Sequence, residues 1–459
     1  PSMAPRTDAG TGLCAHRGAI LHFRSDPGPQ DDPASFEYLA DGLLITDNGR
    51  VAAVRPAREL LPSLPRDSQL VDHGENLLIP GFVDVHTHYP QTDVIASGGR
   101  GLLDWLENHT FPAERAFADA AHARAVAEFF LDELLRNGTT TAMVFCTVHR
   151  ASVEAFFRAA AARHLRMVAG KVLMDRNCPQ ELRDSPQEGE RDSRELLQAW
   201  HGRERLLYAI TPRFALTSSA AQLESAGRLA RDFPDSLIQT HVAENPDEVA
   251  RARQLFPATR SYLDVYDRYG LLRERAVYAH GIYFDAADRA RMAQSGASAA
   301  FCPSSNLYLG SGLFDMAAAD AAGMRYAAAT DVGAGSSFSM LRVLADAYKV
   351  AQLLRQQLPP LRAFYLATLA GARALGIDHQ VGRFAPGTEA DFIVLDLRAT
   401  ALIARRTAQA RTLSEKLLVL MTLGDDRVVS RTYILGREVR AAAVFSGTTA
   451  ENSTRGPSA

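Results

Sequence analysis

Two histidines one residue apart end a short run of strand-forming residues that begins at Phe82. Side chains two residues apart on a β-strand point to the same face, so His86 and His88 project together. Two imidazoles on one rigid strand suit a borderline metal such as zinc. Polar strand-end histidines that face water explain the same spacing, so the pair alone leaves both interpretations open.

Three further residues of metal-binding type, His241, His280 and Asp331, stand at the ends of later strand-like runs. Taken singly, each could be a hydrogen-bonded structural residue. Eight strand-like runs alternate with helix-compatible segments or loops, at 81–88, 139–146, 164–174, 206–213, 237–241, 276–280, 297–302 and 324–331. Eight βα units in series predict an α/β fold, the (β/α)8 or TIM-like barrel, whose catalytic residues come from the C-terminal ends of its strands. On that fold all five side chains would face one mouth.

The two ends of the chain predict a second, smaller unit. Strand patterns at 12–24 and 42–54, the latter with the turn signal Asp47-Asn48-Gly49, find matching strand-like material only at 390–396 and 428–440. We therefore predict a small β-sandwich domain built from both termini, 1–78 and 381–445, with the barrel, 79–380, inserted between them. Residues 446–459 are small and polar and are predicted to form a disordered tail.

Composition narrows the class of protein. The chain has 459 residues, of which 47% are hydrophobic, and a formal net charge of -3, so it can bury a sizeable core and has no general attraction for nucleic acid. No apolar run approaches the length of a membrane span. The four cysteines form no Cys-x-x-Cys pair, which fits a reducing compartment. We expect a cytoplasmic protein with a small-molecule ligand and neither nucleic acid nor membrane as partner.

Several longer stretches carry a resemblance to a known family. They are His88-Tyr89-Pro90-Gln91, Asn137-Gly138-Thr139-Thr140-Thr141, Thr211-Pro212-Arg213-Phe214-Ala215, His241-Val242-Ala243-Glu244-Asn245 and the run 305–312. With the His-x-His strand and the three later strand-end residues, the chain resembles the amidohydrolase superfamily over nearly its whole length. Within that superfamily it is similar to the guanine-deaminating branch. The resemblance implies a homodimer and a purine substrate.

The expected centre is a single metal ion held by histidines and one carboxylate. The ligand set is His86, His88, His241, His280 and Asp331, with His280 either a ligand or a group that orients the water. We expect one Zn²⁺ per subunit, with iron as the alternative. A bridging lysine for a second metal usually comes from strand four in the resembled superfamily. The predicted fourth strand has no lysine, and Lys171 lies in the third, so we expect one metal.

The expected chemistry is hydrolytic deamination. A metal-activated water would attack the amino-bearing ring carbon, since a bound metal lowers the pKa of water to about 7. The resemblance implies that Glu244 is the proton shuttle, that Asp331 is both metal ligand and base, and that His280 assists. Without a metal nearby, Glu244 could equally be a carboxylate at the N-terminus of the helix that follows Pro246.

The predicted substrate contacts are Gln91, Arg213 and Phe214. An arginine fork and an amide edge can read the carbonyl and ring nitrogens of a purine, and a phenylalanine can pack on its face. Taken singly, Arg213 could be a surface residue, Gln91 could hydrogen-bond to backbone groups, and Phe214 could be a core residue. The resemblance instead implies that all three contact the base. We also expect five residues of the metal and proton-transfer set to border the substrate: His88, His241, Glu244, His280 and Asp331.

Two segments are expected around the pocket. Residues 102–112, which include Trp105 and His109, should form a loop or short helix over the mouth, without a role for His109. Residues 306–312 should be pocket wall. Two alternative functions stay open: the same fold and metal acting on another purine, pterin or triazine ring or on a ring amide, and a non-catalytic scaffold, which would be expected to have lost ligands.

Overall fold

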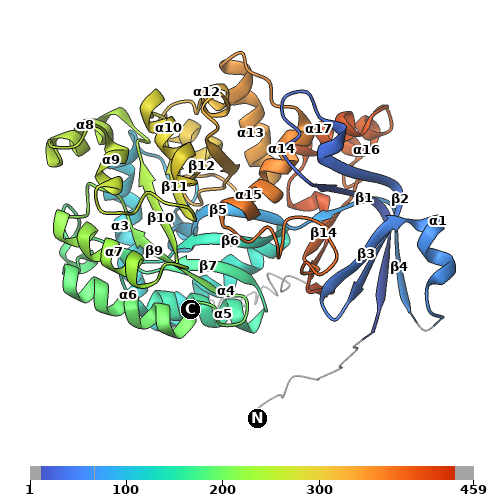
Figure 1. The fold of residues 1–459 in the computed structure, drawn as a ribbon, viewed down its shortest axis with the longest axis horizontal. Coiled ribbons are helices and arrows are strands. Elements are labelled where there is room, and N and C mark those ends of the chain that lie inside the picture. The colour runs from blue at the N-terminus through green and yellow to red at the C-terminus, as the bar shows by residue number, and fades with distance from the viewer. Residues whose placement is uncertain (1–11, 67, 440–459) are drawn as a thin grey trace, which may run out of the picture.

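The computed structural model describes residues 12–66 and 68–439. Eight parallel strands form a near-closed barrel in the hydrogen-bonded order β13-β12-β11-β10-β9-β7-β6-β5. Helices surround the barrel, and the terminal sheet lies beside it, with the first and last parts of the described chain together (Figure 1). The predicted α/β barrel with a β domain built from both termini is confirmed.

Apart from the third, each barrel strand ends within three residues of the end predicted from the sequence. They are β5 (Phe82–His88), β6 (Thr139–Phe145), β7 (Arg166–Gly170), β9 (Leu207–Pro212), β10 (Leu237–Val242), β11 (Ala276–His280), β12 (Ser298–Phe301) and β13 (Arg325–Ala328). The run predicted as one third strand is divided at Lys171 into β7 and β8 (Val172–Leu173), and β8 pairs only with β9. The barrel seam joins the ends of its first and last units, where Asp331 N donates to His86 O at 2.9 Å and His88 N donates to Val332 O at 2.9 Å.

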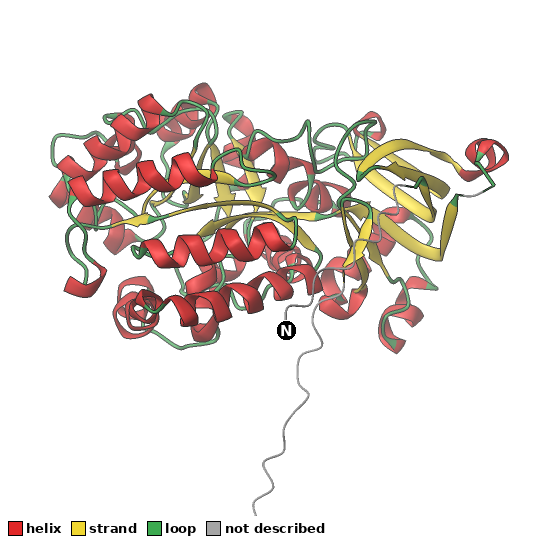
Figure 2. Cartoon of the chain, turned by 90° about the horizontal axis from the view of Figure 1, so that it is seen from below, coloured by secondary structure: helices red, strands yellow, loops and turns green. Residues whose placement is uncertain are grey.

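The helices of the barrel unit lie around its strands (Figure 2). They are α4 (Ala120–Arg136), α5 (Arg150–Ala162), α6 (Pro186–Trp200), α7 (Ala220–Asp232), α8 (Pro246–Leu255), α9 (Tyr262–Asp267), α10 (Ala286–Ser295), α11 (Pro303–Tyr308), α12 (Met316–Ala321), α13 (Met340–Leu353), α14 (Pro360–Leu366) and α15 (Leu369–Ala374). Helix α4 is capped by the Asp119 side chain and followed by Gly138 with φ +78°. Its Val126, Phe130 and Leu134 are buried, whereas Phe129 is exposed.

A covering segment, residues 102–115, crosses the C-terminal mouth between β5 and α4. It consists of α2 (Leu102–Trp105), a π-helical turn η4 (Leu106–Thr110) and α3 (Phe111–Arg115). Leu102, Trp105, Leu106 and Phe111 are its buried apolar residues. The predicted short helix over the mouth is therefore present. His109 instead hydrogen-bonds the carbonyl of Gly98 through Nε2 at 2.7 Å.

The terminal domain is a single seven-stranded sheet of order β16-β15-β14-β4-β1-β2-β3. The sequence predicted a β-sandwich there, which has two separate sheets. Its strands are β1 (Cys14–Phe23), β2 (Phe36–Asp47), β3 (Arg50–Pro56), β4 (Gln69–Pro80), β14 (Phe392–Leu395), β15 (Val429–Ile434) and β16 (Arg437–Val439), accompanied by α1 (Ala57–Leu60), α16 (Ala401–Thr407) and α17 (Leu413–Leu423). The β2–β3 hairpin turns at Asn48 and Gly49, as predicted. The proposed tail at 446–459 lies outside the described residues.

Buried charges fasten the sheet to the N-terminal end of the barrel. Arg166 at the start of β7 and Arg205 before β9 both pair with Glu389, and Arg205 also pairs with Asp391. All four side chains are at most 10% exposed. Removing one partner of such a network leaves an uncompensated buried charge, so the two units are held in fixed relation. No helix within residues 12–66 and 68–439 combines the length and apolar character needed to cross a bilayer.

Candidate active site

Four side chains converge at the C-terminal mouth. Two come from β5, one from β10 and one from the loop after β13. The Nε2 atoms of His86 and His88 are 3.2 Å apart, and His241 Nε2 lies 3.2 Å from His88 Nε2. Asp331 Oδ1 lies 3.2 Å from His86 Nε2 and 3.4 Å from His88 Nε2. One ligand atom from each of these residues lies within 4.8 Å of all the others, and all four residues are buried. We call His86, His88, His241 and Asp331 the cage.

The hydrogen bond of His241 turns the lone pair of its other ring nitrogen toward the rest of the cage. His241 Nδ1 lies 2.7 Å from the carbonyl oxygen of Arg213, which can only accept, so the proton is on Nδ1 and Nε2 carries a lone pair. Burial lowers the pKa of His88 to about 3 and that of His241 well below its ordinary value, which keeps both imidazoles neutral. Although burial opposes ionisation, the imidazoles of His86, His88 and His280 hold the pKa of Asp331 well below its usual range.

These residues fit a divalent cation. Three imidazole nitrogens this close cannot all donate to one another, and a shared cation would satisfy all three lone pairs at once. Ligands at ~2.0–2.1 Å from a tetrahedral ion are about 3.3–3.4 Å apart, close to the distances between the cage atoms. Three histidines and one carboxylate are a donor set that Zn²⁺ accepts.

His280 and Glu244 lie beside the cage and face each other. His280 Nε2 is 3.3 Å from Glu244 Oε2 and 3.8 Å from Asp331 Oδ2, while His280 Nδ1 lies 2.9 Å from Asn306 Oδ1. Ser311 Oγ donates to Glu244 Oε1 at 2.9 Å, so each carboxylate oxygen has a neighbour. Burial, with the nearby Asp331 carboxylate, raises the pKa of Glu244 to about 8. The pair therefore lies where a proton could pass between a ligand and the cage.

The backbone holds these catalytic candidates in unusual conformations. Ala243, His280 and Asp331 have φ values of +49°, +73° and +50°. Non-glycine residues in the left-handed region are uncommon and cluster at functional sites. After β10, Glu248 accepts from the backbone N–H groups of Glu244 and Asn245, at 2.8 and 3.2 Å, and fixes the turn that carries Glu244. The predicted alternative for Glu244, a carboxylate at the N-terminus of α8, is thus a role that Glu248 fills.

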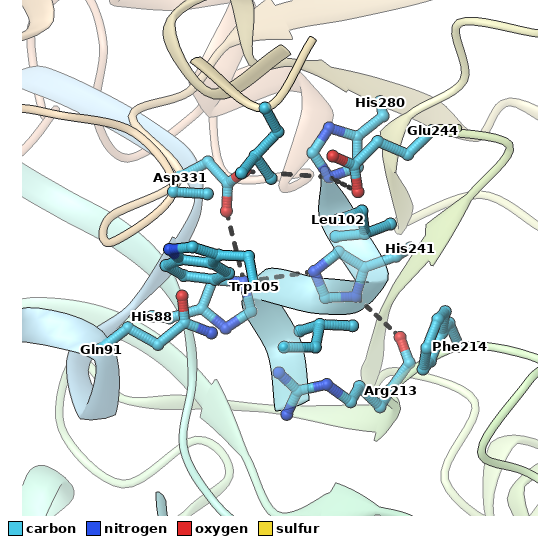
Figure 3. A pocket seen from close by; sticks show the side chains of 13 residues that line it. His88, Gln91, Leu102, Trp105, Arg213, Phe214, His241, Glu244, His280 and Asp331 are labelled. Atoms are coloured by element: carbon cyan, nitrogen blue, oxygen red, sulfur yellow. Dashed lines mark hydrogen bonds and ion pairs between the residues drawn. The ribbon is translucent and has the colours of Figure 1, made fainter. Parts of the chain in front are cut away.

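The predicted substrate contacts line the same pocket (Figure 3). Gln91, Arg213 and Phe214 face it with the cage residues His88, His241 and Asp331 and with Glu244 and His280, and it is roofed by Leu102, Trp105 and Leu106. The Gln91 carbonyl oxygen Oε1 accepts from Gly333 N at 3.2 Å, which leaves the amide N–H₂ for a ligand. A Cβ at Gly333 would meet Gln91 O at 2.4 Å, so this approach requires glycine.

Two further residues with metal-binding side chains are not part of the cage. Lys171, the candidate for a second metal, is buried in an ion pair with Asp184. Cys302, which the sequence did not single out, follows β12 and belongs to a second close group with His86, His280 and Asp331. Its Sγ donates to the carbonyl of Ala300 at 3.4 Å.

Three residues of the site were not predicted individually. Glu114 makes a buried ion pair with Arg213, and Asn306 and Ser311 hold His280 and Glu244. Asn306 and Ser311 lie in the predicted pocket wall, whose hydrogen-bonding side chains were the available signal. Glu114 is 99 residues from its partner, and no local spacing indicates the pair.

Comparison with known proteins places the chain in a family. Residues 77–439 match the amidohydrolase family. The chain is 45% identical to guanine deaminase of Escherichia coli (strain K12) over 428 residues, which cover 93% of this chain and 98% of that protein. It is 40% identical to a probable guanine deaminase of Deinococcus radiodurans over 433 residues, covering 93% of this chain and 98% of the relative.

Solved structures agree with this assignment. The fold superposes on E. coli guanine deaminase with a TM-score of 0.90 over 93% of this chain and 98% of that chain, at 45% identity. A guanine deaminase from C. acetobutylicum with bound guanine in the active site matches with a TM-score of 0.84 at 26% identity, over 93% of this chain and all of that chain. The similarity therefore extends over the barrel, the mouth and the terminal sheet together.

Proposed function

This chain belongs to the amidohydrolase family, and on that premise we propose that it hydrolyses guanine to xanthine and ammonia. One observation carries the proposal: a cation cage, a buried glutamate and an arginine–glutamine pair border a single pocket. The cage supports hydrolysis, the glutamate supports proton transfer, and the donors support binding of a ring with a carbonyl group. A scaffold without catalytic activity would have no need to keep all of them.

The resident cofactor is one divalent cation in the cage, which we propose to be Zn²⁺, with iron as the alternative. Bound there, the cation supplies Lewis acidity that lowers the pKa of a water molecule to about 7. His86, His88, His241 and Asp331 would hold it, and the 3.8 Å between His280 Nε2 and Asp331 Oδ2 fits a role for His280 in orienting the water. The buried Lys171–Asp184 pair supports a single metal, because that lysine already has a partner.

Proton transfer falls to the two carboxylates. Glu244 donates a proton to the ring nitrogen beside the amino-bearing carbon, which makes that carbon more electrophilic as water oxygen bonds to it. Asp331 accepts the proton that the water loses and returns it to the amino group. The C–N bond then breaks and ammonia leaves, while Glu244 recovers its proton from the ring nitrogen or the new oxygen. His280 lies between the two carboxylates and holds them in position relative to each other.

Substrate recognition falls to other residues that line the same pocket. Arg213 and the Gln91 amide donate to the carbonyl oxygen and ring nitrogens of guanine, and Phe214 packs against the ring. Leu102, Trp105 and Leu106 exclude water from above. We further propose a homodimer in the cytoplasm. The family resemblance supports the first, and four unpaired cysteines support a reducing compartment.

The direct test is ammonia release from a panel of aminated rings, with metal content measured on the same preparation. Zinc-loaded protein should release ammonia from guanine with a higher kcat/KM than from adenine, cytosine, a pterin or a triazine. Turnover of one of these rings with none of guanine would refute the proposal. Absence of stoichiometric zinc or iron would instead favour a non-catalytic protein.

A further inference from the structure

The ion pair between Arg213 and Glu114 lies next to the pocket and is almost wholly buried. Arg213 Nη1 donates to both carboxylate oxygens of Glu114, each at 2.8 Å. The two side chains are 2% and 1% exposed. The Phe111 ring lies over the guanidinium, with its centroid 5.5 Å from Cζ. A guanidinium held by a carboxylate at one end and an aromatic face above has one orientation.

This orientation determines which donors remain for a ligand. Nη1 is used by Glu114, whereas Nε and Nη2 make no hydrogen bond with the described residues. Nε–H and one Nη2–H are parallel donors on the same edge of the guanidinium. Such an edge matches two adjacent acceptors, as the carbonyl oxygen and neighbouring ring nitrogen of guanine provide. A 6-aminopurine presents an N–H donor where guanine has the carbonyl oxygen, so donor would face donor.

Glu114 also connects this edge to the roof of the pocket. It lies in α3, at the end of the covering segment that supplies Leu102, Trp105 and Leu106 to the pocket. The ion pair is thus a fixed link between the covering segment and the turn after β9 that carries Arg213. Opening of the roof and loss of the arginine's orientation would be coupled, because both depend on the same carboxylate.

We propose that Glu114 is the positioning residue that makes this pocket selective for oxopurines. It does so by occupying Nη1 of Arg213 and leaving only the Nε/Nη2 edge for the substrate carbonyl. The inference rests on the proposed function, because it assumes that Arg213 reads the base. Glu114 does not touch the reacting atoms, so its effect is on the relative binding of two rings and not on the cage.

The test compares two substrates that carry the same 2-amino leaving group. Guanine and 2,6-diaminopurine differ at position 6, where the oxo group is replaced by an amino group. The measured quantity is the ratio of their kcat/KM values, by ammonia release, for the wild-type enzyme and for Glu114→Gln. We expect the ratio to fall by about tenfold or more, the discrimination that one bidentate arginine contact provides, with zinc content unchanged.

Two further variants separate positioning from folding. A merely structural loss would reduce both activities alike and leave the ratio as in the wild type. Glu107→Gln is the matched control, because Glu107 is an exposed glutamate on the same covering segment, and it should leave the ratio unchanged. Where Glu114→Gln is too unstable to assay, Glu114→Asp keeps the charge and withdraws the carboxylate by one methylene group, and its ratio should fall as well.

The outcomes distinguish this inference from the proposed function. If folded Glu114→Gln and Glu114→Asp keep the wild-type ratio of kcat/KM values while Arg213→Lys lowers it, Glu114 has no positioning role. The proposed function is then unaffected. In Arg213→Lys/Glu114→Gln the ratio should fall no further than in Arg213→Lys alone, and additive losses would contradict the inference. Wild-type enzyme that releases no ammonia from guanine refutes both.

Discussion

Replacing Glu244 by glutamine should remove the proposed proton donor to the ring while changing little else in the site. Glutamine has the same shape, and its carbonyl oxygen can still accept the 2.9 Å hydrogen bond from Ser311 Oγ. Glu244 is not one of the cage residues, so metal content should remain at the wild-type level. What the variant lacks is the acidic proton that the pKa of about 8 makes available at neutral pH.

The expected loss follows from the role of a positioned acid. General acid–base catalysis contributes ~10²- to 10⁴-fold, and at about 1.36 kcal/mol for each factor of ten this is roughly 3–5 kcal/mol of transition-state stabilisation. The Glu244→Gln variant should lose that factor in kcat. KM should change far less, since Arg213, Gln91 and Phe214 are intact.

The assay is steady-state ammonia release from guanine, with zinc measured on the same samples. Glu128→Gln is the matched control, because Glu128 is an exposed glutamate of α4, and it should be indistinguishable from the wild type. A kcat for Glu244→Gln within tenfold of the wild-type value, with metal retained, would remove Glu244 from the mechanism.

Three other predictions concern the network, the metal and pH. Ser311→Ala frees one oxygen of Glu244, so kcat should fall by about fivefold, the effect of one neutral hydrogen bond, at constant zinc content; an unchanged kcat would mean that Ser311 is only pocket wall. Removal of the metal by a chelator should abolish activity and lower Tm, and added Zn²⁺ should restore both; activity that persists in metal-free protein would contradict the cage. Burial lowers the pKa of His16 to about 3, so below about pH 6.5 the unfolded chain binds a proton that the folded chain refuses, and stability falls as pH falls. Between pH 7 and pH 5 this should cost about 2 kcal/mol, and urea unfolding of His16→Gln should show a correspondingly smaller pH dependence; equal pH dependence in both proteins would assign the effect elsewhere.

The sequence was most informative where chemistry and secondary structure coincide. The four histidines of the predicted site lie within the last three residues of their strands, and Asp331 follows three residues after β13. The barrel rule brings the C-terminal ends of strands to one mouth, where the structure has all five residues. Local sequence patterns were less informative about strand ends and ion pairs that depend on contacts with other elements. The run 164–174 looks like one strand, yet β7 ends before Lys171, whose ammonium turns to Asp184.

Other features depend on contacts between distant residues. Strand β4 has mixed polar and apolar residues, and its place in the sheet depends on pairing with both β1 and β14. Glu114 has the local sequence of an ordinary helix, and its buried ion pair is with Arg213 on another element. A single sequence contains no signal for such a pair, because residue spacing reports only on neighbours within one helix or strand.

The terminal sheet has a consequence for how the chain is made. Strand β14 pairs with β4 on one side and β15 on the other, so the sheet combines segments from both ends of the polypeptide. During synthesis β4 leaves the ribosome with one edge open, and its partner follows only after the whole barrel, a delay of about 15–60 s at ~5–20 residues per second. The strand that covers β4 is therefore made only after the barrel, and a chain terminated before β14 would present an unpaired β4 edge to other nascent chains.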